Sequence, residues 1–83
     1  MNRRDEWRNI LDAEVKRWSA LSFDDLISAL SDRQRYEVDF DSQKFQVEVQ
    51  VLEITEKYLH VVVAVDDGTP VRPLSHSFFC PAN

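Results

Sequence analysis

The chain has 83 residues, 43% of them hydrophobic, and this length supports one hydrophobic core and leaves no room for a second domain. Its net charge of -5 lies in the second half, because residues 1–35 carry seven basic and seven acidic side chains, whereas residues 36–83 carry three basic and eight acidic ones. The acidic half lacks the clustered Lys and Arg that bind phosphate backbones, which disfavours direct binding to DNA or RNA.

Two helices are predicted before residue 33. From Asp5 to Ser19, apolar residues recur every three or four positions and form one helical stripe, which contains Trp7, Ile10, Leu11, Val15 and Trp18. Ser22 followed by Asp25 has the spacing of a capping box, so a second helix is expected to run from Phe23 to Leu30.

After Arg33 the apolar period changes to two, which predicts strands. A turn of two residues at Asp41 and Ser42 would join the first two strands into a hairpin. This register sets Val38 opposite Phe45 and places Arg35 beside Glu48, an opposite-charge pair of the stabilising kind.

The second strand loses its alternation near Val51 and Leu52, which predicts a bulge before a turn at residues 55–57. The third strand is expected from Tyr58 to Asp66, followed by a turn at residues 67–70 that contains the only glycine.

The last strand is expected to cover residues 71–79 and to pair Asp66 with Val71. This pairing would set Val61 opposite His76. Because Pro73 cannot donate a ladder hydrogen bond, the strand should lie at an edge of the sheet. Residues 81–83 are expected to form a frayed tail.

These elements predict an α+β domain covering residues 1–83, in which two N-terminal helices pack on one face of a four-stranded antiparallel meander of order 1-2-3-4. The residues expected to face the helices are Tyr36, Val38, Phe40, Phe45, Val47, Val49, Leu59, Val61, Val63, Leu74 and Phe78. The other face would carry Glu37, Asp39, Gln46, Glu48, Gln50, His60, Val62, Ser75, Ser77 and Phe79.

We expect no catalytic, cofactor or metal site. His60, His76 and Cys80 are the only soft or borderline metal ligands, and the predicted register points the two histidines to opposite faces of the sheet. Ser75 and Ser77 flank His76, but neighbouring strand residues also point to opposite faces. A single glycine excludes a glycine-rich phosphate loop.

Composition also predicts the compartment. The single cysteine excludes an internal disulfide and favours a reducing environment, which we expect to be the cytoplasm. Residues 2–8 are charged and no apolar signal core follows them. The longest apolar run, residues 61–65, is too short to cross a bilayer, so we expect no membrane partner.

Several segments resemble a group of short uncharacterised bacterial proteins: RDEWRNILDAEVKRWSALSFDDLISAL, YEVDF, FQVEVQVLE, YLHVVVAVDDG and SHSFFC. The resemblance covers nearly the whole chain. It implies a bacterial, cytoplasmic protein and brings no activity, ligand or functional residue with it.

The leading functional hypothesis is a small protein-interaction module that uses the acidic sheet face or an edge strand, with a second copy of the chain among its candidate partners. The residues expected on this interaction face are Glu37, Asp39, Gln46, Glu48, Gln50, His60 and Phe79. One alternative is a small-ligand binder with a pocket between helices and sheet near Tyr36, Tyr58 or His76. Another is an inhibitor or immunity-like protein that neutralises a basic enzyme.

Overall fold

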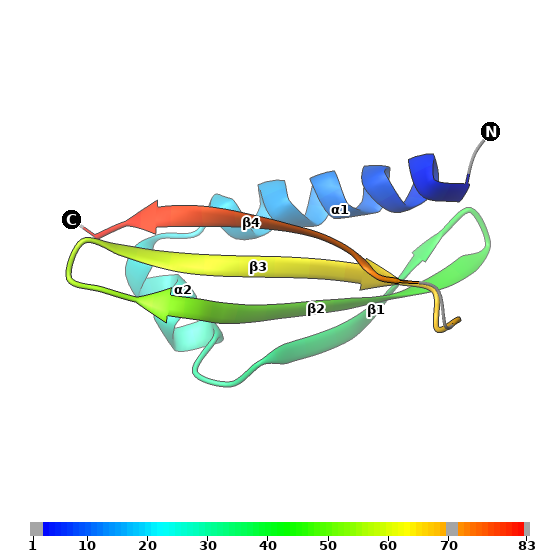
Figure 1. Cartoon of the computed structure of the whole chain (residues 1–83). Coiled ribbons are helices and arrows are strands. Elements are labelled where there is room, and N and C mark those ends of the chain that lie inside the picture. The colour runs from blue at the N-terminus through cyan, green and yellow to red at the C-terminus, as the bar shows by residue number, and fades with distance from the viewer. Residues whose placement is uncertain (1–2, 70–71, 83) are drawn as a thin grey trace.

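The computed structural model describes residues 3–69 and 72–82 and has the predicted order of two helices followed by four strands. The strands form one antiparallel sheet of order β1-β2-β3-β4, which confirms the α+β meander. The elements, shown in Figure 1, are α1 (Arg3–Ser19), α2 (Phe23–Ala29), β1 (Gln34–Phe40), β2 (Gln43–Ile54), β3 (Tyr58–Asp66) and β4 (Leu74–Pro81).

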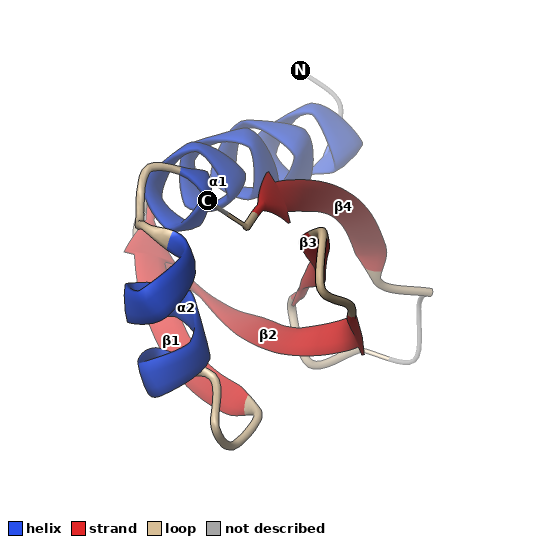
Figure 2. Cartoon of the chain, turned by 90° about the vertical axis from the view of Figure 1, so that its left-hand side faces the viewer, coloured by secondary structure: helices blue, strands red, loops and turns tan. Residues whose placement is uncertain are grey.

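The molecule measures 41 × 21 × 19 Å along its principal axes. The sheet is strongly curled about the long axis (Figure 2). Figure 2, a view along the strands, shows α1 at the open side of the curl, where it lies between β4 and β1. The backbone of α1 packs closely against β3 and β4. The concave side of the sheet is therefore closed by a helix, and neither of the two described helices lies over the convex side (Figure 2).

The second helix begins as its capping pattern predicts. The backbone N–H of Asp25 donates to Ser22 Oγ at 3.1 Å, which satisfies one of the free N–H groups of the first turn. At the other end, the N–H of Leu30 donates to the carbonyl of Leu26 at 2.8 Å and closes the helix.

The β1–β2 hairpin has the predicted turn and register. Asp41 and Ser42 both have positive φ, at 52° and 65°, as the tight two-residue turns of hairpins require. Val38 lies opposite Phe45, and Arg35 lies opposite Glu48. The predicted bulge is also confirmed, because the register of β2 against β3 shifts between Val51 and Glu53.

The predicted pairing of β3 with β4 was wrong by two residues. His76 lies opposite Val63, and Phe78 takes the place opposite Val61 that we had assigned to His76. A shift of two keeps every side chain on its expected face, so the apolar pattern alone could not detect it. The expected partner of Asp66, Val71, lies outside the described residues.

The C-terminal end is also better ordered than predicted. β4 begins at Leu74, so Pro73 precedes it, and the strand runs on to Pro81. The N–H of Ala82 donates to the carbonyl of Lys57 at 2.9 Å, which ties this end to the β2–β3 turn. The expected frayed tail is therefore a paired strand end through Ala82, and Asn83 lies outside the described residues.

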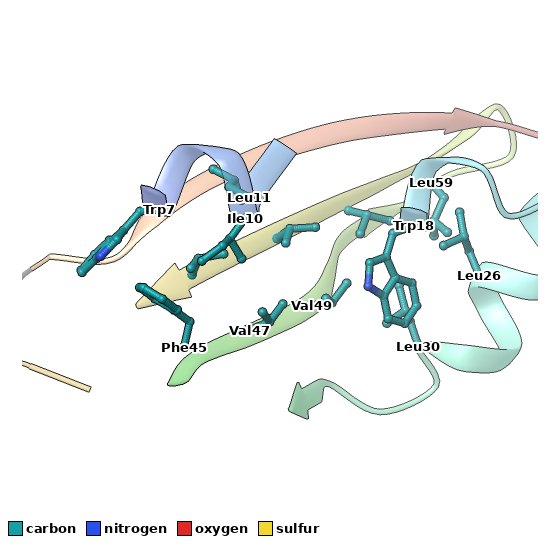
Figure 3. Close-up of a cluster of buried hydrophobic side chains, with 13 residues drawn as sticks. Trp7, Ile10, Leu11, Trp18, Leu26, Leu30, Phe45, Val47, Val49 and Leu59 are labelled. Atoms are coloured by element: carbon teal, nitrogen blue, oxygen red, sulfur yellow. The ribbon is translucent and has the colours of Figure 1, made fainter. Parts of the chain in front are cut away.

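The core fills the space between the helices and the concave face of the sheet (Figure 3). Trp7 packs edge-on against Phe45, with ring centroids 6.4 Å apart. Phe40, expected in the core, is 37% exposed because it is the last residue of β1 and lies beside the turn. The buried apolar residues are Trp7, Ile10, Leu11, Trp18, Leu26, Leu30, Phe45, Val47, Val49, Leu59, Val61, Val63 and Val65.

Candidate functional site

The residues predicted for an interaction face lie on the convex face of the sheet, where they form two groups. The register places Glu37 opposite Gln46 and sets His60 opposite Phe79. The acidic group near the β1–β2 turn consists of Glu37, Asp39, Gln46 and Glu48. The aromatic group at the far end of β3 and β4 contains His60 and Phe79, and Gln50 lies between the two groups.

The acidic group borders a shallow depression of about 190 Å³. Its charge is lower than the composition of this half suggested, because Glu48 is paired twice. Arg35 Nε lies 2.9 Å from one carboxylate oxygen of Glu48, and Arg33 Nη1 lies 3.4 Å from the other. Asp66, which was not among the residues predicted for the interaction face, also lines the depression.

The aromatic group is more compact than expected. Phe79 lies opposite His60 in the observed register and stacks on it, with ring centroids 4.1 Å apart and an interplanar angle of 11°. The ring of Tyr58 packs edge-on against the Phe79 ring, with centroids 5.2 Å apart. The Tyr58 hydroxyl donates a hydrogen bond to Glu53 at 2.7 Å. Phe79 nevertheless remains 60% exposed.

One edge of the sheet is open, and it belongs to β1. Phe40 and Gln43 flank the two-residue turn and form a hydrogen-bonded pair. Because hydrogen-bonded and non-hydrogen-bonded pairs alternate in an antiparallel ladder, Phe40 and every second residue before it form the backbone hydrogen bonds to β2. The backbone N–H and C=O groups of Arg35, Glu37 and Asp39 therefore point away from β2. Within the described residues β1 pairs only with β2, and in Figure 1 it starts below β2 and passes behind it.

A groove of about 170 Å³ lies beside this edge. It lies between α1 and the second half of β1, and its walls are mainly apolar or small. The lining residues are Asn9, Ile10, Ala13, Glu14, Val38, Asp39 and Phe40. An added strand would thus find both backbone partners and a shallow apolar surface at β1.

A polar cluster connects α1 to β1 beside the groove. The hydroxyl of Tyr36 donates to Glu14 Oε1 and accepts from Trp18 Nε1 at 2.8 Å. Arg17 lies 3.6 Å from the same carboxylate oxygen and its guanidinium carbon is 5.8 Å from the centre of the Tyr36 ring. Glu14 is the one buried charged residue of the described chain, at 9% exposure. Its place on the apolar stripe of α1, four residues from Ile10 and from Trp18, was the sequence signal for this contact.

Stability should fall at high pH because of Tyr36. Burial, and then the hydrogen bond to Glu14, raise the pKa of Tyr36 from 10.0 to about 12. The folded chain holds this proton more tightly than the unfolded chain, so the stabilisation is complete below pH 10 and is lost as the pH rises to about 12. This difference in pKa corresponds to about 2.7 kcal/mol, which solvent screening at this half-buried group reduces to about 1 kcal/mol.

Urea unfolding at a series of alkaline pH values, followed by tryptophan fluorescence, measures this loss. The Tyr36→Phe variant is the control, since it lacks the titrating group and should show a smaller loss between pH 10 and 12. An equal alkaline loss in both proteins would contradict the assignment to Tyr36.

A second groove, of about 480 Å³, lies between α2 and the end of β2. Ile27 and Ile54 line it and are 38% and 61% exposed. Its lining does not include Tyr36, Tyr58 or His76, around which we expected a small-ligand pocket. Ile54 follows the bulge and lies opposite the buried Leu59, so the bulge turns it to the concave side of the sheet, where it borders this groove and stays exposed.

The two histidines lie on opposite faces of the sheet, as predicted, although the register differs. His60 pairs with Phe79 on the convex face, and His76 pairs with Val63, whose side chain belongs to the core. In the described part of the chain, no group of three or more His, Cys, Asp or Glu side chains has the arrangement of a metal site. Neither described helix is long and apolar enough to cross a membrane.

The fold and site define an α+β protein with an uncovered convex face and an open β1 edge. No family model, curated protein or solved structure matches the chain.

Proposed function

We propose that this chain is a non-enzymatic protein-interaction module, whose partner adds an extended segment to the free edge of β1. The observation that carries this proposal is the row of outward-directed backbone groups at Arg35, Glu37 and Asp39. Unpaired edges of this kind are templates for strand addition, in which main-chain hydrogen bonds supply affinity and neighbouring pockets supply specificity.

The two edges of the sheet differ in a way that supports β1. β4 has α1 packed against it, and it is bounded by Pro73 before its first residue and Pro81 at its last. Proline at strand ends and a covering helix are both ways in which proteins block an edge. β1 contains no proline, is joined to α1 through the long side chain of Tyr36, and has the groove beside it.

A cytoplasmic location is part of the proposal. Cys80 is the single cysteine of this sequence and is a free thiol. Free thiols are typical of a reducing compartment. An interaction module of one small domain is also in keeping with a chain of 83 residues.

Proline at position 37 tests the edge with little change to the hairpin. The N–H of Glu37 points away from β2, so Glu37→Pro removes an edge donor and leaves the β1–β2 hydrogen bonds in place. Glu37→Ala is the matched control, because it removes the same side chain and keeps the N–H. We expect proteins captured by the wild-type chain and by Glu37→Ala from a lysate of the source cells to bind Glu37→Pro at least about tenfold more weakly.

Two measurements complete this experiment. Circular dichroism and urea unfolding check that the proline variant keeps its fold. Hydrogen exchange on the purified complex should show the amides of Arg35 and Asp39 protected by the partner. Equal capture by the proline and alanine variants, or a complex that leaves these amides unprotected, would overturn the proposal.

A further inference from the structure

We propose that the segment which pairs with β1 is β1 of a second copy of the chain, antiparallel to the first and related to it by a two-fold axis beside Tyr36. This inference rests on the proposed function, since it names the partner of the same edge. It predicts a continuous sheet across two protomers, as isologous dimers commonly form.

The order of charges along β1 carries the argument. From residue 33 to residue 39, the side chains on the convex face are Arg33, Arg35, Glu37 and Asp39, two positive and then two negative. Arg33 lies directly before the strand, and its contact with Glu48 places it on the same face as Arg35. Tyr36 is the midpoint of this row. Each positive side chain on one side of Tyr36 therefore has a negative side chain at the same distance on the other side.

Antiparallel pairing about Tyr36 uses this inversion at every position. It sets Arg35 of each copy opposite Glu37 of the other and each Arg33 opposite Asp39. Three of these residues, Arg35, Glu37 and Asp39, are also the ones whose backbone groups point to the open edge. The same register thus satisfies the edge hydrogen bonds and the charges together.

The neighbouring registers do not have this property. An axis at Glu37 would place the two Glu37 side chains opposite each other, and an axis at Arg35 would do the same with the two arginines. Parallel pairing in register would oppose every charge to its own kind. Because like charges directly opposite one another are destabilising, the row selects one orientation and one register.

The monomer already holds the basic half of the row in place. Glu48 accepts from Arg35 at 2.9 Å and from Arg33 at 3.4 Å, so both guanidinium groups are held over the convex face. In the dimer each Arg35 would lie between Glu48 of its own copy and Glu37 of the partner. Arg35 side chains are 71% exposed in the monomer, which leaves them accessible to that second carboxylate.

Charge-altered variants test the register directly. Glu37→Arg with Asp39→Arg makes the row wholly positive, and Arg33→Glu with Arg35→Glu makes it wholly negative. Wild-type protein should sediment with twice the mass of one chain at high concentration. Each double variant should dimerise about a hundredfold more weakly or not at all, and an equal mixture of the two should recover a heterodimer.

The matched control for Glu37→Arg with Asp39→Arg carries the same change of net charge at positions away from the β1 edge. Asp12→Arg with Glu56→Arg alters two exposed acids, one on α1 and one in the β2–β3 turn, and should dimerise like the wild type. Added salt should weaken the wild-type dimer, because its charge pairs lie at the surface. A control variant that loses the dimer, or a mixture that stays monomeric, would overturn the inference.

The outcomes separate this inference from the proposed function. A wild-type chain that stays monomeric at every concentration overturns self-pairing, while capture of another protein that depends on the Glu37 N–H would still support strand addition at β1. A dimer that persists in Glu37→Pro would use another surface and would count against self-pairing at this edge.

Discussion

Replacement of Phe45 by alanine should destabilise the fold more than any other single truncation on the sheet. Phe45 is fully buried and packs edge-on against Trp7. Phenylalanine-to-alanine changes in a core cost about 3 to 5 kcal/mol, and a domain of this size has only about 4 to 12 kcal/mol of stability in all. Urea unfolding followed by the fluorescence of Trp7 and Trp18 should show a strongly lowered midpoint, which reaches zero denaturant if the wild-type stability lies at the low end of this range.

The matched control for this change is Phe79→Ala, on the opposite face of the sheet. Phe79 is 60% exposed on the convex face, where its ring stacks on His60 and meets Tyr58 edge-on. We expect its truncation to cost about 1 kcal/mol or less. Similar losses of unfolding free energy in the two variants would contradict the assignment of the core to the concave face.

The second large effect is expected at Tyr36. Tyr36→Phe removes the hydroxyl that donates to Glu14 and accepts from Trp18 Nε1, so a mostly buried carboxylate and an indole N–H both lose a partner. Leaving buried polar groups unpaired costs about 1 to 3 kcal/mol. The change should lower the urea midpoint and loosen the contact between α1 and β1.

Tyr58→Phe is the matched control, because it also removes a tyrosine hydroxyl that donates to a glutamate. The bond from Tyr58 to Glu53 is exposed, so water replaces it, and we expect a cost below about 0.5 kcal/mol. An effect of Tyr36→Phe no larger than that of Tyr58→Phe would show that the polar cluster contributes nothing to the docking of α1.

The hairpin of β1 and β2 was predictable because three local signals agree. The alternation, the two-residue turn and the pair of Arg35 with Glu48 all require the same register. The pairing of β3 with β4 had only the alternation to define it. Since a shift of two residues leaves the alternation unchanged, the faces were predicted correctly and the neighbours were not.

The same error hid part of the candidate site. The predicted register pairs His60 with Ser77 and does not bring Phe79 beside it, so the stacked aromatic group follows only from the observed register. The polar cluster around Tyr36 was hidden for another reason. The place of Glu14 on the apolar stripe of α1 indicates that its carboxylate faces the sheet, but its partner Tyr36 depends on how α1 docks across the sheet, which no pattern within a single element describes.

The tip of the first hairpin has a consequence for protein engineering. Its two turn positions are left-handed, and they are filled by aspartate and serine, whereas asparagine and glycine adopt this geometry at the lowest cost. The natural chain therefore leaves unused stabilisation at two positions that are not themselves among the residues proposed to contact a partner. Redesign of that corner offers a way to offset the losses caused by changes along the strand it supports, so that binding variants can be compared in an equally folded background.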